Sequence, residues 1–142
     1  VDPSSSIASY NTMTSSTVTG SNIDNDTAAI AVGAKSGNTS EFGTTATINV
    51  TLDTTPTANV SIVVTDNDST EVSITLTTLT ITPSTWNTTN QVTLTGQDDS
   101  DNYGNITFRI SFGNATSTDS KYNGMAPSPA FVDVINLADY ED

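Results

Sequence analysis

Hydrophobic and polar residues alternate with a period of two along most of the chain. One extended segment places its hydrophobic residues at Ala46, Ile48, Val50 and Leu52, with polar residues between them. The same alternation recurs in the segments 28–32, 60–64, 72–76, 79–81, 92–94, 106–112 and 132–134. Clusters of Gly, Pro, Asn and Asp separate these segments, as is typical of turns. The pattern therefore predicts about eight short strands and no helix.

Length and composition together indicate a single domain. The 142 residues suffice for a single domain with one core, and Thr, Ser and Asn together occupy about 60 positions. This mixture disfavours helices. Short strands without helices between them predict an all-β fold, an antiparallel immunoglobulin-like β-sandwich of about seven or eight strands. The only tryptophan, Trp86, is expected to plug one end of the sandwich.

The charge and the missing residue types exclude several classes of function. The chain has no Cys or His, which removes disulfides, imidazole bases and the zinc sites that depend on them. A net charge of −13 repels phosphate backbones, so nucleic acid is not an expected partner. No apolar run approaches the length of a spanning helix, so direct membrane insertion is not expected either. Catalysis would have to rest on carboxylates, and nothing marks a cleft around them. We therefore predict that the protein is not an enzyme.

Part of the sequence is repeated. Tyr-Asn-x-Met occurs at 10–13 and again at 122–125, and each copy precedes an acidic Asn-containing ending, at 22–26 and 136–142. Chance similarity is the alternative in a chain so rich in Ser, Thr and Asn, but the shared order and spacing favour true repetition. We therefore divide the chain into 1–26, equivalent to the end of a preceding repeat, and 27–142, one sandwich repeat with an acidic C-terminal linker.

Acidic residues gather in five short groups near the ends of the predicted strands. The groups are Asp24/Asp26, Glu41, Asp66/Asp68/Glu71, Asp98/Asp99/Asp101 and Asp139/Glu141/Asp142. Strands that run up and down would bring several of these loops to one end of a sandwich. Crowded carboxylates repel one another unless a cation lies among them, and Ca²⁺ prefers six to eight oxygen ligands from such loops. Solvated acids that keep the protein soluble are the alternative interpretation.

One stretch resembles a known family. Residues 79–88, Leu-Thr-Ile-Thr-Pro-Ser-Thr-Trp-Asn-Thr, continue through a Val-Thr strand and Gly96 to Asp98-Asp99. This order resembles the central signature of Calx-β-like repeats, which occur in tandem in bacterial extracellular surface proteins and adhesins. The similarity extends from about residue 25 to residue 142, and it includes Ser40-Glu41-Phe42-Gly43 as the start of a strand.

The resemblance implies a calcium site and its ligands. Carried over by position, the metal ligands are Glu41, Asp66, Asp68, Asp98, Asp99, Asp139, Glu141 and Asp142. Two departures from the family pattern affect this transfer: Phe42 separates Glu41 from Gly43, and the acids after Asp98-Asp99 are reduced to Asp101. Ion binding is then either lost or shared between neighbouring repeats.

Eight Asn-x-Ser/Thr sequons form a further motif. They begin at Asn25, Asn38, Asn49, Asn59, Asn67, Asn87, Asn105 and Asn114. On a secreted protein such sequons accept glycans. The alternative is that Thr is simply favourable on the solvent face of a strand and creates sequons by chance.

These features lead to two hypotheses about function. The first is a non-enzymatic structural or adhesive repeat of an extracellular, cell-surface protein, stiffened by calcium at its acidic loops and junctions. Its partners would be like repeats end to end, together with surface glycans or proteins. The alternative is a self-assembling filament subunit, joined to identical subunits by β-strand exchange through residues 1–26.

Overall fold

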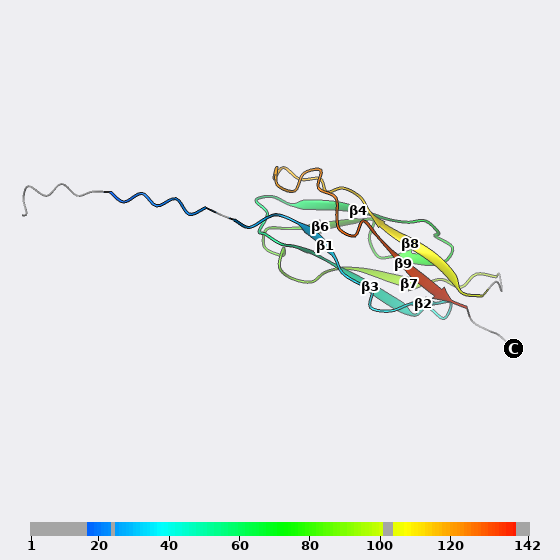
Figure 1. The fold of residues 1–142 in the computed structure, drawn as a ribbon. Helices are drawn as coiled ribbons and strands as arrows, with labels where there is room; N and C mark the ends of the chain where they lie inside the picture. Colours follow the sequence, from blue (N-terminus) through cyan, green and yellow to red (C-terminus); the bar gives the residue numbers. More distant parts are fainter. Residues whose placement is uncertain (1–16, 24, 101–103, 139–142) are drawn as a thin grey trace, which may run out of the picture.

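The computed structural model shows nine strands in two sheets that pack face to face (Figure 1). It describes residues 17–23, 25–100 and 104–138. The strands are β1 (Ile30–Val32), β2 (Thr39–Ser40), β3 (Thr45–Leu52), β4 (Val60–Asp66), β5 (Val72–Ile74), β6 (Thr78–Ile81), β7 (Asn90–Gly96), β8 (Ile106–Phe112) and β9 (Phe131–Leu137). Within these ranges there is no helix that could cross a membrane. The predicted all-β sandwich is therefore confirmed.

The two sheets differ in size, and the first two strands of the chain belong to different sheets. The four-stranded sheet has the order β1-β3-β7-β5, and the five-stranded sheet has the order β2-β9-β8-β4-β6. All neighbouring strands are antiparallel except β2 and β9, which run parallel. Because β1 and β2 belong to different sheets, the chain crosses from one sheet to the other between residues 32 and 39.

Hydrogen bonds between β1 and the segment that precedes β9 close one side of the sandwich. The N–H of Val32 donates to the carbonyl of Ser128 at 3.0 Å, and the N–H of Ser128 donates to the carbonyl of Ile30 at 3.0 Å. The edge of β1 is thereby covered by the segment that precedes β9. On the opposite side, β5 and β6 form the outer edges of the two sheets.

The core consists of the inward-facing residues of both sheets. In β3 the side chains alternate strictly between exposed or half-buried and buried, so that Ala46, Ile48, Val50 and Leu52 face inward. Phe108 and Ile110 of β8 meet them from the five-stranded sheet, and both are almost completely buried. Burial of this apolar surface is the main force that holds the sheets together.

The strand directions define two ends of the molecule. At the proximal end, residues 25–29 run up to β1, and the connections 53–59, 82–89 and 113–130 lie there too. At the distal end, β9 finishes, and residues 41–44, 67–71 and 97–100 connect other strands (Figure 1). The chain thus enters the sandwich at one end and leaves it at the other.

Glycine is required where β2 crosses β7. A Cβ atom on Gly96 would clash with the carbonyl oxygen of Ser40 and would lie 2.6 Å from Oδ1 of Asn136. No side chain fits in that space. The backbone of β2 can therefore reach the end of β9 only because residue 96 has no side chain.

Most predicted strands agree with the structure, with three differences. The strand Thr39–Ser40 was not predicted, the segment 72–76 ends as a strand at Ile74, and the first strand begins at Ile30 rather than at residue 28. Trp86 lies in the connection between β6 and β7 at the proximal end, half-buried against the core. Of the predicted tail 1–26, residues 17–23, 25 and 26 are exposed and form no strand, and the rest lies outside the described residues.

Candidate functional site

The most unusual side chain at the distal end is Glu71, a carboxylate that is only 5% exposed. Its position is fixed by the backbone, because the N–H of Gln97 donates to the carbonyl of Glu71 at 3.0 Å. Glu71 immediately precedes β5, whose first residue, Val72, pairs with Gly96 of β7. The register of these two strands therefore holds the carboxylate at the rim of the core.

Asn136 connects Glu71 to three other parts of the chain. Its Nδ2 donates to Oε2 of Glu71 at 3.1 Å and to the carbonyl of Gln97 at 3.0 Å. Its Oδ1 accepts a hydrogen bond from Oγ1 of Thr39 at 2.9 Å. Asn136 is itself buried, on the inward face of β9. Within the described residues, every buried side-chain nitrogen and oxygen has a partner.

The surroundings of Glu71 make its ionisation unfavourable. Burial raises the pKa of Glu71, the hydrogen bond from Asn136 lowers it, and the neighbouring carboxyl groups of Asp99 and Asp68 raise it again. A side-chain hydrogen bond between Glu71 and Asp99 contributes to this increase. Two carboxyl groups can share such a bond only if one of them holds a proton. A cation between them would take the place of that proton.

The predicted metal ligands that the structure describes all lie at the distal end. Asp66 ends β4, and Asp68 follows it in a turn where its Oδ1 accepts hydrogen bonds from the N–H and the Oγ1 of Thr70 at 3.2 Å and 2.6 Å. Asp98 and Asp99 follow β7, and the N–H of Glu41 donates to the carbonyl of Leu137 at the end of β9. Asp139, Glu141 and Asp142 lie outside the described residues.

These acids share one end of the sandwich without forming a closed metal cage. Among the described residues, no group of three or more acidic side chains is close enough to hold a metal ion. The carboxyl groups in contact are those of Glu71 and Asp99, with the charge of Asp68 nearby. In the sequence Glu71 belongs to one of the acidic groups but not to the predicted ligands. The sequence feature that could have identified Glu71 is its position directly before the buried Val72.

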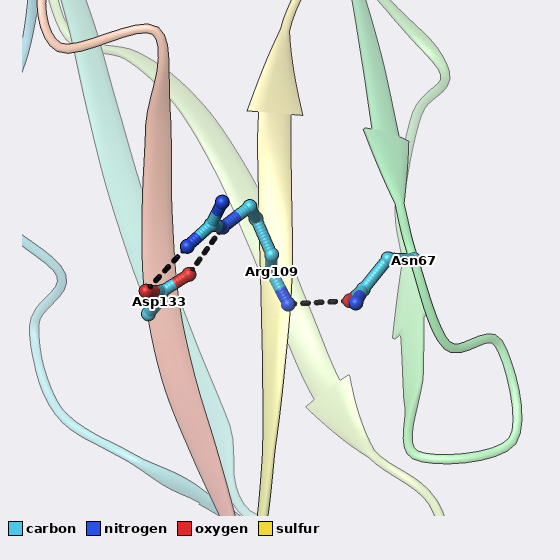
Figure 2. A network of polar contacts seen from close by, with 3 residues as sticks. All are labelled: Asn67, Arg109 and Asp133. Atoms are coloured by element: carbon cyan, nitrogen blue, oxygen red, sulfur yellow. Dashed lines mark hydrogen bonds and ion pairs between the residues drawn. The ribbon is translucent and has the colours of Figure 1, made fainter.

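A second polar cluster lies on the outer face of the five-stranded sheet. Nε and Nη2 of Arg109 donate to the two carboxylate oxygens of Asp133 at 2.7 Å and 3.0 Å, and Oδ1 of Asn67 accepts the Arg109 N–H at 2.6 Å (Figure 2). The guanidinium carbon also lies 3.7 Å from the ring centre of Phe131. The hydrogen bond to Arg109 lowers the pKa of Asp133. Arg109 and Asp133 lie opposite each other in the pairing of β8 with β9, and since both charged side chains are 45% exposed, the pair adds little stability.

The chain was also compared with known proteins. No protein-family model matches it, and no curated protein matches it either.

Proposed function

We propose that the protein is a non-enzymatic structural module of an extracellular surface protein, joined end to end to like modules. The observation that supports this is the position of the two ends of the domain. Residues 25–29 reach β1 at the proximal end, whereas β9 finishes at the distal end (Figure 1). Successive domains with this geometry extend along one line.

Electron microscopy and sedimentation of the full chain test this proposal. A multi-domain protein built from such modules that appears as an extended rod is the expected result, while the isolated chain stays monomeric. A compact parent particle with domains packed side by side would contradict it.

In this proposal Ca²⁺ binds at the distal end, between Glu71 and Asp99. Calcium accepts carboxylate oxygens in flexible arrangements and retains water where protein ligands are few. The contact between the two carboxyl groups and the nearby charge of Asp68 favour a cation at this point. The ion would remove the repulsion that opposes ionisation of Glu71 and would stiffen the distal loops.

Calorimetry with Ca²⁺ and with excess chelator tests whether the folded chain binds Ca²⁺. We expect Ca²⁺ to raise the melting temperature by several degrees, because an ion that binds only the folded chain stabilises it by mass action. Glu71→Gln should abolish this increase. Asp53→Asn changes the charge equally at an exposed position of the proximal end and should preserve it. Identical melting temperatures of the unaltered chain with and without Ca²⁺ would refute the calcium part of the proposal alone.

A second candidate function is a filament subunit joined by β-strand exchange. Residues 17–23 form no strand, and two large hydrophobic side chains in this segment are exposed, Val18 by 89% and Ile23 by 75%. An exposed segment that forms no strand within its own domain can add to the edge of a neighbouring sheet. The edge strands β5 and β6 are available for such pairing.

Two sets of variants test strand exchange. Deleting residues 1–21 should leave a folded sandwich that no longer polymerises, since the core from Ala46 to Val134 is kept. Val18→Ser with Ile23→Ser should weaken assembly more than Val63→Ser, which alters a 52% exposed residue in the middle of β4. A full-length chain that stays monomeric under all calcium conditions would exclude the filament.

A further inference from the structure

The sequons lie where a glycan could be accommodated. Seven of the eight sequon asparagines are exposed, and Asn38 is half-buried. Five of them lie in five different connections between strands: Asn59, Asn67, Asn87, Asn105 and Asn114. By contrast, the buried Asn136 and the half-buried Asn90 are not in sequons.

In two sequons the hydrogen bonds given for the asparagine side chain use Oδ1 and not Nδ2, the nitrogen to which a glycan is attached. Oδ1 of Asn67 accepts the N–H of Arg109 at 2.6 Å, and Oδ1 of Asn105 accepts the N–H of Ala138 at 3.1 Å (Figure 2 shows the first). A backbone N–H can only donate, so the amide orientation is fixed and Nδ2 is the remaining group. Glycosylation at Nδ2 keeps the amide carbonyl, so both hydrogen bonds survive the modification.

Two asparagines outside sequons use the same nitrogen structurally. Nδ2 of Asn90 donates to the carbonyls of Thr85 and Thr88 at 2.9 Å and 3.1 Å, and Nδ2 of Asn136 donates to Glu71 and Gln97. A glycan on either nitrogen would break these bonds. Asn90 and Asn136 thus hold the fold through the nitrogen that a glycan would occupy, whereas Asn67 and Asn105 do not.

We propose that Asn67 and Asn87, which lie in two of these connections, are acceptors of N-linked glycans. The whole sequons of these two residues lie outside the strands, and their hydroxyl residues, Ser69 and Thr89, are exposed. In the transfer, Nδ2 bonds to the anomeric carbon of a lipid-linked oligosaccharide pyrophosphate. The bond from that carbon to phosphate breaks, the lipid pyrophosphate leaves, and the amide proton passes to a base of the transferase.

The fold also selects against two sequons when transfer occurs on the folded chain. The hydroxyl of the Asn38 sequon belongs to Ser40, which is buried and hydrogen-bonded to Oγ1 of Thr44 at 2.6 Å. Asn49 lies within β3, whose backbone is paired with β1 and β7. A transferase must bind the sequon in an accessible extended form, which these two positions do not offer. Asn38 and Asn49 should therefore stay unmodified.

Incubation of the purified, folded full chain with an oligosaccharyltransferase and a lipid-linked oligosaccharide, followed by intact-mass and glycopeptide analysis, tests the assignment. Glycans at Asn67 and Asn87, and none at Asn38, are expected. Ser69→Ala and Thr89→Val should each remove one glycan mass, whereas Thr80→Ala, an exposed threonine outside any sequon, should remove none. An unmodified chain, or equal occupancy at Asn38 and Asn67, would overturn the proposal.

The inference rests on the proposed extracellular location, but different measurements refute the glycosylation sites and the proposed structural function. In this experiment the folded chain is presented directly to the transferase, so glycan occupancy reports on the acceptor geometry alone. Electron microscopy of a multi-domain protein built from such modules reports on the structural function.

Discussion

The hydroxyl group of Tyr122 donates a hydrogen bond to the carbonyl oxygen of Thr54 at 2.7 Å, and both residues are buried. The same hydroxyl oxygen accepts the N–H of Thr54 at 3.1 Å. Tyr122 belongs to the long connection between β8 and β9, and Thr54 belongs to the connection between β3 and β4. One side chain therefore ties two loops of the proximal end together, in a region where no strand ladder joins them.

Tyr122→Phe should lower the free energy of unfolding by about 2 kcal/mol. The substitution keeps the ring but leaves the buried N–H and carbonyl of Thr54 without this partner, and an unsatisfied buried polar group costs roughly 1–3 kcal/mol. Urea unfolding measures the change. Thr54→Val removes only the hydroxyl of Thr54, which lies 2.7 Å from the tyrosine oxygen, and should cost less. A Tyr122→Phe variant as stable as the unaltered chain would show that water replaces the lost group.

Gly96→Ala should be strongly destabilising, on the order of 3 kcal/mol or failure to fold, because overpacked backbone cannot relax cheaply. The new Cβ would meet the carbonyl of Ser40, which cannot move without breaking the pairing of β2 with β9. Gly37→Ala is a matched control, since a Cβ at that position meets nothing within 4 Å. Thermal unfolding of both variants compares them. Equal melting temperatures would contradict the close approach of Ser40 to Gly96.

The raised pKa of Glu71 predicts a specific pH dependence. A carboxyl group whose pKa is raised on folding weakens the folded state once pH exceeds its unfolded value. Stability should therefore fall as pH rises from the ordinary value of 4.5 through the higher folded value, in the absence of Ca²⁺. Glu71→Gln should melt at a higher temperature than the unaltered chain at pH 7 and at a similar one at pH 4. Melting curves at several pH values test this, and a constant difference between the two proteins would contradict it.

Trp86→Ala should cost about 2 kcal/mol, less than a fully buried aromatic residue, since the side chain is only half-buried against the core. The ring covers the proximal end between β6 and β7. Chemical unfolding gives the change in free energy, and the fluorescence of this single tryptophan reports the transition in the unaltered chain. A loss below about 0.5 kcal/mol is typical of surface substitutions and would mean that the ring does not support the core.

The larger strands could be predicted because each has an inner and an outer face. In β3 the residues Ala46 and Ile48 are buried while Thr45 and Asn49 are exposed, so the period of two in the sequence directly reflects burial. The strand β2 could not be predicted in this way. Thr39 and Ser40 are both polar, and Thr39 is buried because Asn136 satisfies its hydroxyl group.

The acidic end could be predicted only in outline. Loop positions and alternating strand direction indicate which acids share an end, and the described ones do lie at the distal end. Which carboxyl groups touch depends on register, which brings Glu71 beside Gln97 and therefore near Asp99. That register follows from the pairing of Val72 with Gly96 and is not encoded in the spacing of the acids.

The parallel pairing of β2 with β9 has a mechanical consequence. In an end-to-end array, tension pulls β1 and β2 toward the proximal end and β9 toward the distal end. The two strands would then slide along each other, so the bonds from Glu41 to Leu137 and between Val32 and Ser128 are loaded in shear. Bonds loaded in this way must break together, whereas bonds at a peeled edge break one at a time. The crossing of the first strand between the sheets therefore makes the domain resist stretching along its long axis.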